Sequence, residues 1–139
     1  MTPHSRNIVG ITLGIAFVSV GIQHFVNTDL FNEIVPPYLG WPTFWTYISG
    51  ILEVVLGVGI VIPRTRAYSA QLLVGLVLCL SLANLHMWMD DVPFNGTRLT
   101  TTDHIVRWCI QFLLFAVLLW LGEKIGKSQT ESSTSEDAT

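Results

Sequence analysis

The chain has 139 residues, of which 50% are hydrophobic and only 12% are charged. A soluble domain usually carries about twice that share of charged residues, so the composition argues against a soluble domain and favours a membrane protein. The length allows one compact bundle and excludes a second domain of comparable size. The formal net charge of −3 owes much to three acids near the C-terminus, Glu131, Glu136 and Asp137, so the predicted bundle itself is close to neutral. Nothing in the sequence is basic enough to indicate a nucleic-acid partner.

Four apolar runs follow one another along the chain. They cover residues 8–25, 45–62, 67–88 and 105–121. Each run has about the length that a helix needs to cross roughly 30 Å of hydrocarbon. The sequence therefore predicts an all-α, multi-pass fold, an antiparallel bundle of four transmembrane helices. We expect this membrane domain to span residues 8–125, between a cytoplasmic N-terminus at 1–7 and a disordered, polar cytoplasmic tail at 126–139.

Arg6 precedes the first apolar run, as a basic residue does in a secretory signal peptide. No small-x-small cleavage site follows, and three more apolar runs come later, so we expect this run to be kept as the first transmembrane helix. Basic residues also predict orientation, because short loops rich in Lys and Arg stay in the cytoplasm. Five of them fall on one side of the predicted membrane domain, namely Arg6, Arg64, Arg66, Lys124 and Lys127. Both termini should therefore be cytoplasmic.

The connection between the first two runs is long and unusually apolar. Pro36 and Pro37 prevent one continuous helix there, while the aromatic residues of this segment suit a membrane interface. We expect a short helix around residues 29–34, followed by an interfacial or re-entrant segment across the outer mouth of the bundle. The connection after the second run is much shorter, because Pro63 ends the helix and residues 64–66 leave room only for a tight turn.

Small residues predict how the helices pack, because close contact between helices in lipid depends on backbones that can approach each other. Gly14 and Gly21 lie on the same face of the first predicted helix as His24. In the second predicted helix, Gly57 lies on the same face as Glu53. Glu53 should therefore point at protein and not at lipid.

Polar side chains that are costly inside a bilayer gather at one depth of the predicted bundle. Because successive helices alternate in direction, six such residues fall in the same leaflet, which is the outer one in the predicted orientation. They are Gln23, His24, Glu53, Asn84, Arg107 and Gln111. The candidate ligand-binding residues within this layer are His24, Glu53, Asn84, Arg107 and Gln111.

Two interpretations of this layer remain open. In the structural interpretation, Glu53 and Arg107 form an ion pair that joins the second and fourth helices, since an unpaired charge in the bilayer is costly. Asn84 and Gln111 would complete the hydrogen bonds of that pair. In the functional interpretation, the same pair lines a pocket that opens to the outer side and is covered by the proline-containing first loop.

Metal and thiol chemistry have weaker support. His24 and His86 lie on different predicted helices at similar depth, as two haem ligands would, but Asn84 and His86 point about 200° apart on their helix. The chain has no Cys-x-x-Cys-His motif, and a zinc site built on His24, Glu53 and His86 lacks the usual ligand spacing. The two cysteines, Cys79 and Cys109, fall within apolar runs, where a small buried thiol is an ordinary core residue. We expect no metal site and no catalytic residue.

Several short motifs lie at the ends of the predicted helices and along their glycine faces. They are Gly21-x-x-His24-Phe25, Phe31-x-x-Ile34-Val35-Pro36-Pro37, Tyr47-x-Ser49-Gly50-x-x-Glu53-x-x-x-Gly57, Pro63-x-x-Arg66, Ala83-Asn84-x-x-Met87 and Arg107-x-x-x-Gln111. In this order and spacing, along residues 7–125, the chain resembles the DoxX-like membrane proteins. The resemblance implies a four-helix bundle with a polar interior, in a bacterial or archaeal plasma membrane. Trp108 departs from the pattern of many relatives, which have a residue leading into proline, so a kinked fourth helix is not expected.

The DoxX-like family includes the small subunit of an archaeal thiosulfate:quinone oxidoreductase and many bacterial proteins of unassigned activity. We expect this chain to bind a membrane lipid or small lipophilic molecule in its polar layer, or to serve as an accessory subunit, rather than to be an enzyme on its own. One alternative is a quinone-linked redox subunit, in which Arg107 or His24 bonds a quinone carbonyl and a partner redox protein supplies the electrons. The other alternative is an assembly scaffold with a purely structural polar layer.

Overall fold

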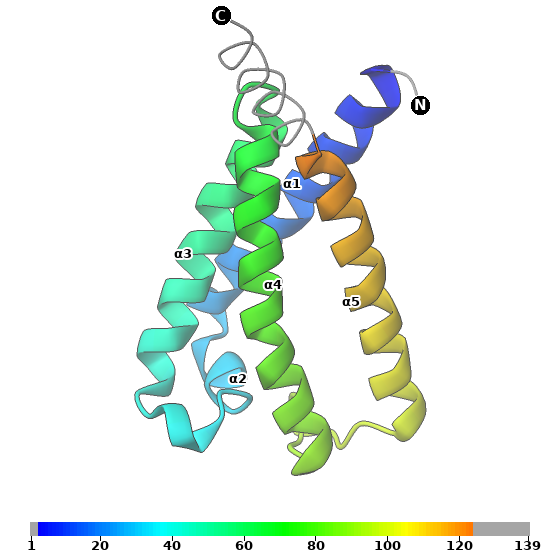
Figure 1. Cartoon of the computed structure of the whole chain (residues 1–139). Coiled ribbons are helices and arrows are strands. Elements are labelled where there is room, and N and C mark those ends of the chain that lie inside the picture. Colours follow the sequence, from blue (N-terminus) through cyan, green and yellow to red (C-terminus); the bar gives the residue numbers. More distant parts are fainter. Residues whose placement is uncertain (1–2, 124–139) are drawn as a thin grey trace, which may run out of the picture.

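The computed structural model describes residues 3–123, which form four long helices and two short helical segments (Figure 1). In chain order these are α1 (Pro3–Val26), α2 (Thr28–Asn32), the 3-10 segment η1 (Pro37–Leu39), α3 (Pro42–Val61), α4 (Arg66–Met89) and α5 (Thr101–Gly122). The predicted all-α, four-helix fold is confirmed. Because α1 begins at Pro3, residues 3–7 belong to the first helix and do not precede it. The predicted tail at 126–139 lies outside the described residues.

The two ends of the bundle differ in what they contain. The start of α1, the end of α5 and the tight α3–α4 turn lie together at one end, which we call the terminal end (Figure 1). The other end, which we call the loop end, holds α2, η1 and the connection between α4 and α5 (Figure 1). The predicted polar layer belongs to the loop end.

The long helices pack in a row, with α1 against α3, α3 against α4, and α4 against α5. An apolar core joins all four helices from the middle of the bundle to the terminal end. It consists of Phe17, Leu56, Ile60, Ala70, Leu73, Val77, Leu118 and Leu121. The apolar contacts therefore hold the terminal half together, and polar side chains take part in the packing at the loop end.

Outward-facing side chains of the long helices are apolar and exposed. Ile15, Leu72 and Leu113, for example, are 60%, 61% and 65% exposed. All four helices are long and apolar enough to cross a membrane, so these side chains would face lipid. Cys79 and Cys109 are exposed on the same outer surface, so the prediction that they are core residues is wrong. Their helices turn these positions away from the neighbouring helices.

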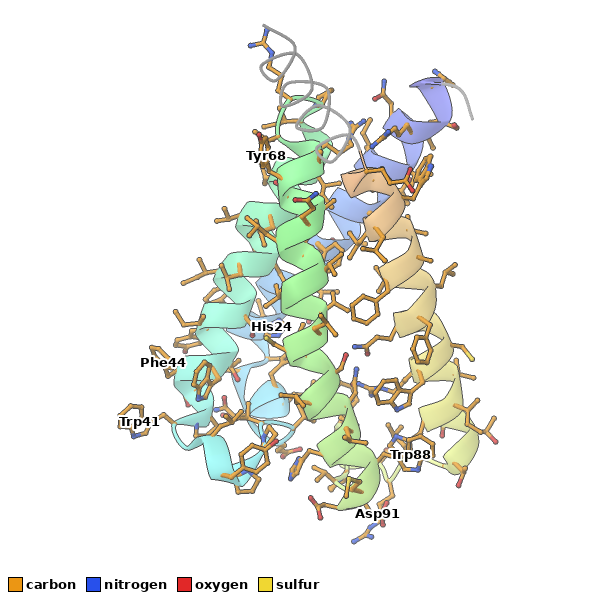
Figure 2. The ribbon with its side chains drawn as sticks, in the orientation of Figure 1. His24, Trp41, Phe44, Tyr68, Trp88 and Asp91 are labelled. Atoms are coloured by element: carbon orange, nitrogen blue, oxygen red, sulfur yellow. The ribbon has the colours of Figure 1, made fainter. Side chains whose placement is uncertain are left out.

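The first loop is folded back onto α3 by side-chain hydrogen bonds. Asn32, at the end of α2, accepts a hydrogen bond from Thr46 Oγ1 at 2.8 Å and donates one to Thr43 Oγ1 at 3.0 Å. The helix α2 begins one residue earlier and ends two residues earlier than the short helix predicted around residues 29–34. Beyond it, Trp41 is 81% exposed and points away from the bundle (Figure 2).

Two arginines tie the helices together at the terminal end. The buried side chain of Arg66 donates hydrogen bonds to the carbonyl oxygens of Ile60 (2.8 Å) and Val61 (3.1 Å) in α3, and to Asn7 Oδ1 (2.7 Å) in α1. Arg6 donates to the Leu121 carbonyl at the end of α5. Neither arginine was predicted to join helices, yet both satisfy carbonyl groups that a helix end leaves without partners.

Candidate ligand-binding site

The polar layer is divided into two separate clusters. The first joins α1 and α3 and contains His24 and Glu53, which are only 4% and 3% exposed. His24 Nδ1 lies 3.4 Å from Glu53 Oε2 and 2.9 Å from the carbonyl oxygen of Val20, to which it is hydrogen-bonded. Phe31 of α2 stacks on the His24 ring, with the ring centroids 3.8 Å apart. We call this group the α1–α3 pair.

Glycines bring the two members of the α1–α3 pair within reach. A Cβ atom on Gly50 would lie 2.8 Å from His24 Cβ and 3.0 Å from the Gly21 carbonyl oxygen. A Cβ atom on Gly21 would in turn lie 2.8 Å from the Gly50 carbonyl oxygen. A methyl group would not fit at these distances. Because glycine has no side chain, the two backbones can approach closely here, as the glycine faces predicted.

The second cluster joins α4 and α5 through a directed chain of hydrogen bonds. Arg107 Nη2 donates to Asn84 Oδ1 at 3.0 Å, and Asn84 Nδ2 donates to Gln111 Oε1. Gln111 Nε2 then donates to Ser81 Oγ and, at 3.1 Å, to the carbonyl oxygen of Val77. We call this group the α4–α5 network. Its far end is anchored on the backbone, so the orientations of Gln111 and Asn84 are fixed.

The predicted ion pair between Glu53 and Arg107 is wrong. The carboxyl group of Glu53 lies beside the His24 ring, 3.4 Å from its Nδ1, and Arg107 binds a neutral amide. The physical reason is the order of packing, because α3 presents Glu53 to α1 whereas α5 packs against α4. Equal depth in the membrane therefore does not bring the two charges together. Gln23 is also not part of either cluster, since it is exposed on α1 and accepts a hydrogen bond from Asn27 Nδ2.

Acidic groups near Arg107 are engaged with other partners. Asp91 pairs with Arg98, and Asp90 Oδ2 lies 3.2 Å from His86 Nε2. Asp103 is held in a capping box at the start of α5, where its Oδ2 accepts from Thr100. None of the ion pairs within residues 3–123 includes Arg107. Its guanidinium instead lies over the ring of Phe94, 5.3 Å from the centroid.

Three buried polar atoms in the described part of the chain have no hydrogen-bond partner, and all belong to residues at or near the loop end. They are Glu53 Oε2, His86 Nδ1 and Trp108 Nε1. Such atoms are rare in folded proteins and often mark a missing water, ion or ligand. Trp108 was not among the predicted site residues. A tryptophan within an apolar run is a usable signal, because its indole N–H needs an acceptor when it is buried.

Aromatic residues also line the loop end between α4 and α5. Trp88 stacks on the buried His104, with centroids 5.6 Å apart and planes nearly parallel. The haem hypothesis required His24 and His86 to face each other, but each is already paired with a carboxylate, Glu53 and Asp90 respectively. Within residues 3–123, no group of three or more His, Cys, Asp or Glu side chains is placed to hold a metal ion.

A groove of about 250 Å³ lies on α1 and α3 nearer the terminal end, away from both clusters. It is lined by Gly14, Ile15, Val18, Ser19, Val58, Val61 and Ile62. The groove is open and apolar, and it is not the polar pocket that was predicted beneath the first loop. Its lining faces outward, as expected of a surface in contact with lipid chains.

Unfolding measurements on a double-mutant cycle should confirm the new pairing. We expect His24→Phe and Glu53→Gln to show a coupling free energy of about 1 kcal/mol, because the two side chains are in contact. Glu53→Gln and Arg107→Gln should add to within about 0.5 kcal/mol, because they share no partner. Denaturant unfolding in detergent would measure both cycles. A larger coupling for Glu53 with Arg107 than with His24 would contradict the pairing described here.

One family model matches residues 13–121 of the chain, and it is described as a domain of unknown function (DUF8561). The match begins within α1, ends within α5, and includes every residue of the α1–α3 pair and the α4–α5 network. No curated protein and no solved structure matches the chain. The family description names neither an activity nor the DoxX-like proteins, so the function has to be argued from the site itself.

Proposed function

The chain belongs to the DUF8561 family, and we propose that it is a multi-pass membrane protein that binds the polar head of a small lipophilic molecule at its α4–α5 network. The observation that carries this proposal is the half-buried Arg107, which lies inside a membrane-spanning helix without a carboxylate partner among residues 3–123. Ionisable groups at such positions are costly and commonly belong to functional sites.

The α4–α5 network is better suited to a ligand than the α1–α3 pair is. His24 and Glu53 are almost fully buried, and Phe31 covers the histidine ring, so a ligand would have to displace protein to reach them. Asn84 and Arg107 are only half-buried, so a molecule in the bilayer can approach them directly. In this proposal the α1–α3 pair positions helices and the α4–α5 network contacts the ligand.

The setting of the proposal is a bacterial or archaeal plasma membrane, as the resemblance to DoxX-like proteins implies. Both termini lie in the cytoplasm in this proposal, as the positive-inside pattern predicts. The loop end would then face outward, and α2 with the exposed Trp41 would lie at the membrane interface. The resemblance to DoxX-like proteins adds the proposal that the chain acts as an accessory subunit beside a partner membrane protein.

A quinone-linked redox subunit is the second candidate function. It is favoured by the buried, unpartnered indole N–H of Trp108, because quinone carbonyls accept hydrogen bonds and Arg107 offers further donors on the same helix. The ligand would then be a quinone head group, and a partner redox protein would have to supply the electrons. This candidate uses the same network, so the identity of the bound molecule separates it from the first.

Native mass spectrometry of gently solubilised protein, with extraction and identification of the bound lipophile, tests the proposed function. We expect wild type to retain a defined molecule and Asn84→Leu to lose about tenfold or more of it, because the variant removes the acceptor that orients Arg107. Gln23→Leu is the matched control, since it removes an exposed amide at the same end. Identical, nonspecific lipids in all three proteins would contradict the proposal.

A further inference from the structure

Arg107 is a cation that forms no ion pair with any carboxylate among residues 3–123. The acids of the α4–α5 connection and the start of α5 are engaged with Arg98, His86 and Thr100. Two further acids of the loop end, Asp29 and Glu33, are exposed at α2, which packs against α3 and α1 rather than α5. The third, Glu53, is buried beside His24 between α1 and α3. Within residues 3–123, Arg107 therefore keeps its positive charge without an ion-pair partner.

The guanidinium is also held in one orientation. Nη2 is fixed to Asn84 Oδ1, whose own amide is fixed to Gln111, and the ring of Phe94 lies beside the guanidinium carbon at 5.3 Å. One hydrogen bond to a side chain uses one of the five N–H donors of an arginine. The donors that remain can bind both oxygens of a carboxylate or phosphate group at once.

The depth of Arg107 fits the polar head of a lipid. It lies about 9 Å along the axis from the first residue of α5, at a rise of about 1.5 Å per residue. A long arginine side chain at this depth reaches toward the head-group level of the bilayer while its methylene groups stay in apolar surroundings. A ligand bound here would keep its hydrocarbon chains beside the exposed apolar face of the helices.

We propose, building on the proposed function, that the ligand of the α4–α5 network carries an anionic head group, a phosphate or a carboxylate, that pairs with Arg107. Three observations support this inference. The guanidinium is oriented by Asn84, and its side chain is only half-buried, so it can be approached from the bilayer. No carboxylate of residues 3–123 forms an ion pair with it. A neutral ligand would leave the charge uncompensated in a medium where pairing is strongly favoured. An anionic one completes the network.

Competition among lipids on delipidated full-length protein tests the inference. The probe is an equimolar mixture of phosphatidylglycerol, oleate, phosphatidylcholine and a ubiquinone, with binding read by native mass spectrometry. We expect phosphatidylglycerol or oleate to exceed the neutral ubiquinone by about tenfold, as one charge-assisted hydrogen bond predicts. Phosphatidylcholine should bind less than phosphatidylglycerol, because its ammonium group offsets the charge of an otherwise equal phosphate. Which of the two anions wins distinguishes a lipid phosphate from a free carboxylate.

Variants assign that preference to Arg107. Arg107→Gln should abolish the preference for anions, and Arg107→Lys should retain part of it because the charge remains. Arg98→Gln is the matched control, since it removes an exposed arginine from the neighbouring connection. If Arg107→Gln does not fold, Asn84→Leu takes its place, because it removes the acceptor that orients the guanidinium and should lower the preference for anions. An undiminished preference in Asn84→Leu would overturn the assignment.

The outcomes separate this inference from the proposed function. Selective binding of the ubiquinone, equal in wild type and Arg107→Gln, would overturn the anionic ligand and leave a lipophile-binding protein. A preference for anions that survives in Arg107→Gln would place the site elsewhere and overturn the assignment to Arg107. Absence of any selective binding in wild type would overturn both proposals.

Discussion

Gly14→Leu is expected to lower the free energy of unfolding by about 3 kcal/mol, because the new side chain has no space between α1 and α3. Even a single Cβ atom on Gly14 would lie 2.6 Å from the carbonyl oxygen of Gly57 and would overlap a methyl carbon of Val61. The first of these neighbours is backbone, so it moves only if the two helices separate. Thermal or denaturant unfolding in detergent would measure the loss.

Gly75→Leu is the matched control for this prediction. Gly75 is on α4, and a Cβ atom built there meets no atom within 4 Å. The substitution should change stability little, or raise it slightly, since leucine favours the helix by nearly 1 kcal/mol over glycine. Equal losses in Gly14→Leu and Gly75→Leu would show that helix propensity or insertion, and not contact between α1 and α3, causes the effect.

Arg66→Met should destabilise the bundle by about 3 kcal/mol. The variant keeps the length of the side chain but leaves two carbonyl groups of α3 and the side chain of Asn7 without their donor, and each unsatisfied buried group costs about 1–3 kcal/mol. Arg66→Lys should lose less stability than Arg66→Met, because one ammonium group can still replace part of the planar arrangement of donors. The same unfolding assay would measure both variants.

Arg64→Met is the control for Arg66→Met, because Arg64 is exposed in the same turn. The two variants change the net charge and the charge of the turn equally. They should differ by most of the predicted loss. If both variants unfold at the same denaturant concentration, the hydrogen bonds of Arg66 do not contribute measurably, and any loss relative to wild type comes from the charge of the turn.

The long helices could be predicted from the sequence because the hydrophobicity that identifies them adds up along the chain. A run of apolar residues long enough to cross a bilayer has few alternatives to a helix, since the backbone must satisfy its own hydrogen bonds in lipid. The start of α5 was predicted four residues late. Thr100 and Asp103 are polar and do not extend an apolar run, but they form the capping box that begins the helix.

The partners of the polar residues were not predictable in the same way. Position along a helix gives depth, and helical periodicity gives the face that a side chain shares with others on its own helix. Neither property gives the order of the helices around the bundle. Glu53 and Arg107 therefore lie at the predicted end of the bundle but do not pair with each other, because packing places them beside His24 and Asn84.

The same limit applies to Trp108 and Arg66. Trp108 was considered only for the shape of its helix, because the need of a buried indole for an acceptor becomes visible when its neighbours are known. Arg66 was interpreted through its charge, although its hydrogen bonds to α3 and α1 depend on how closely the chain folds back at the α3–α4 turn. Local composition identifies a basic turn and does not show which carbonyl groups the turn will meet.

The bonding of Arg6 and Arg66 to helix carbonyls has a consequence for how the orientation of this protein can be determined. Charge-reversal mutagenesis is a common way to map or invert the topology of a multi-pass protein, and these residues are obvious targets for it. Changing either one would remove inter-helix hydrogen bonds together with a topogenic charge, so an inverted reporter signal and a misfolded protein would be confounded. Arg64, which is exposed at the same end, is the position where a topology experiment reads orientation alone.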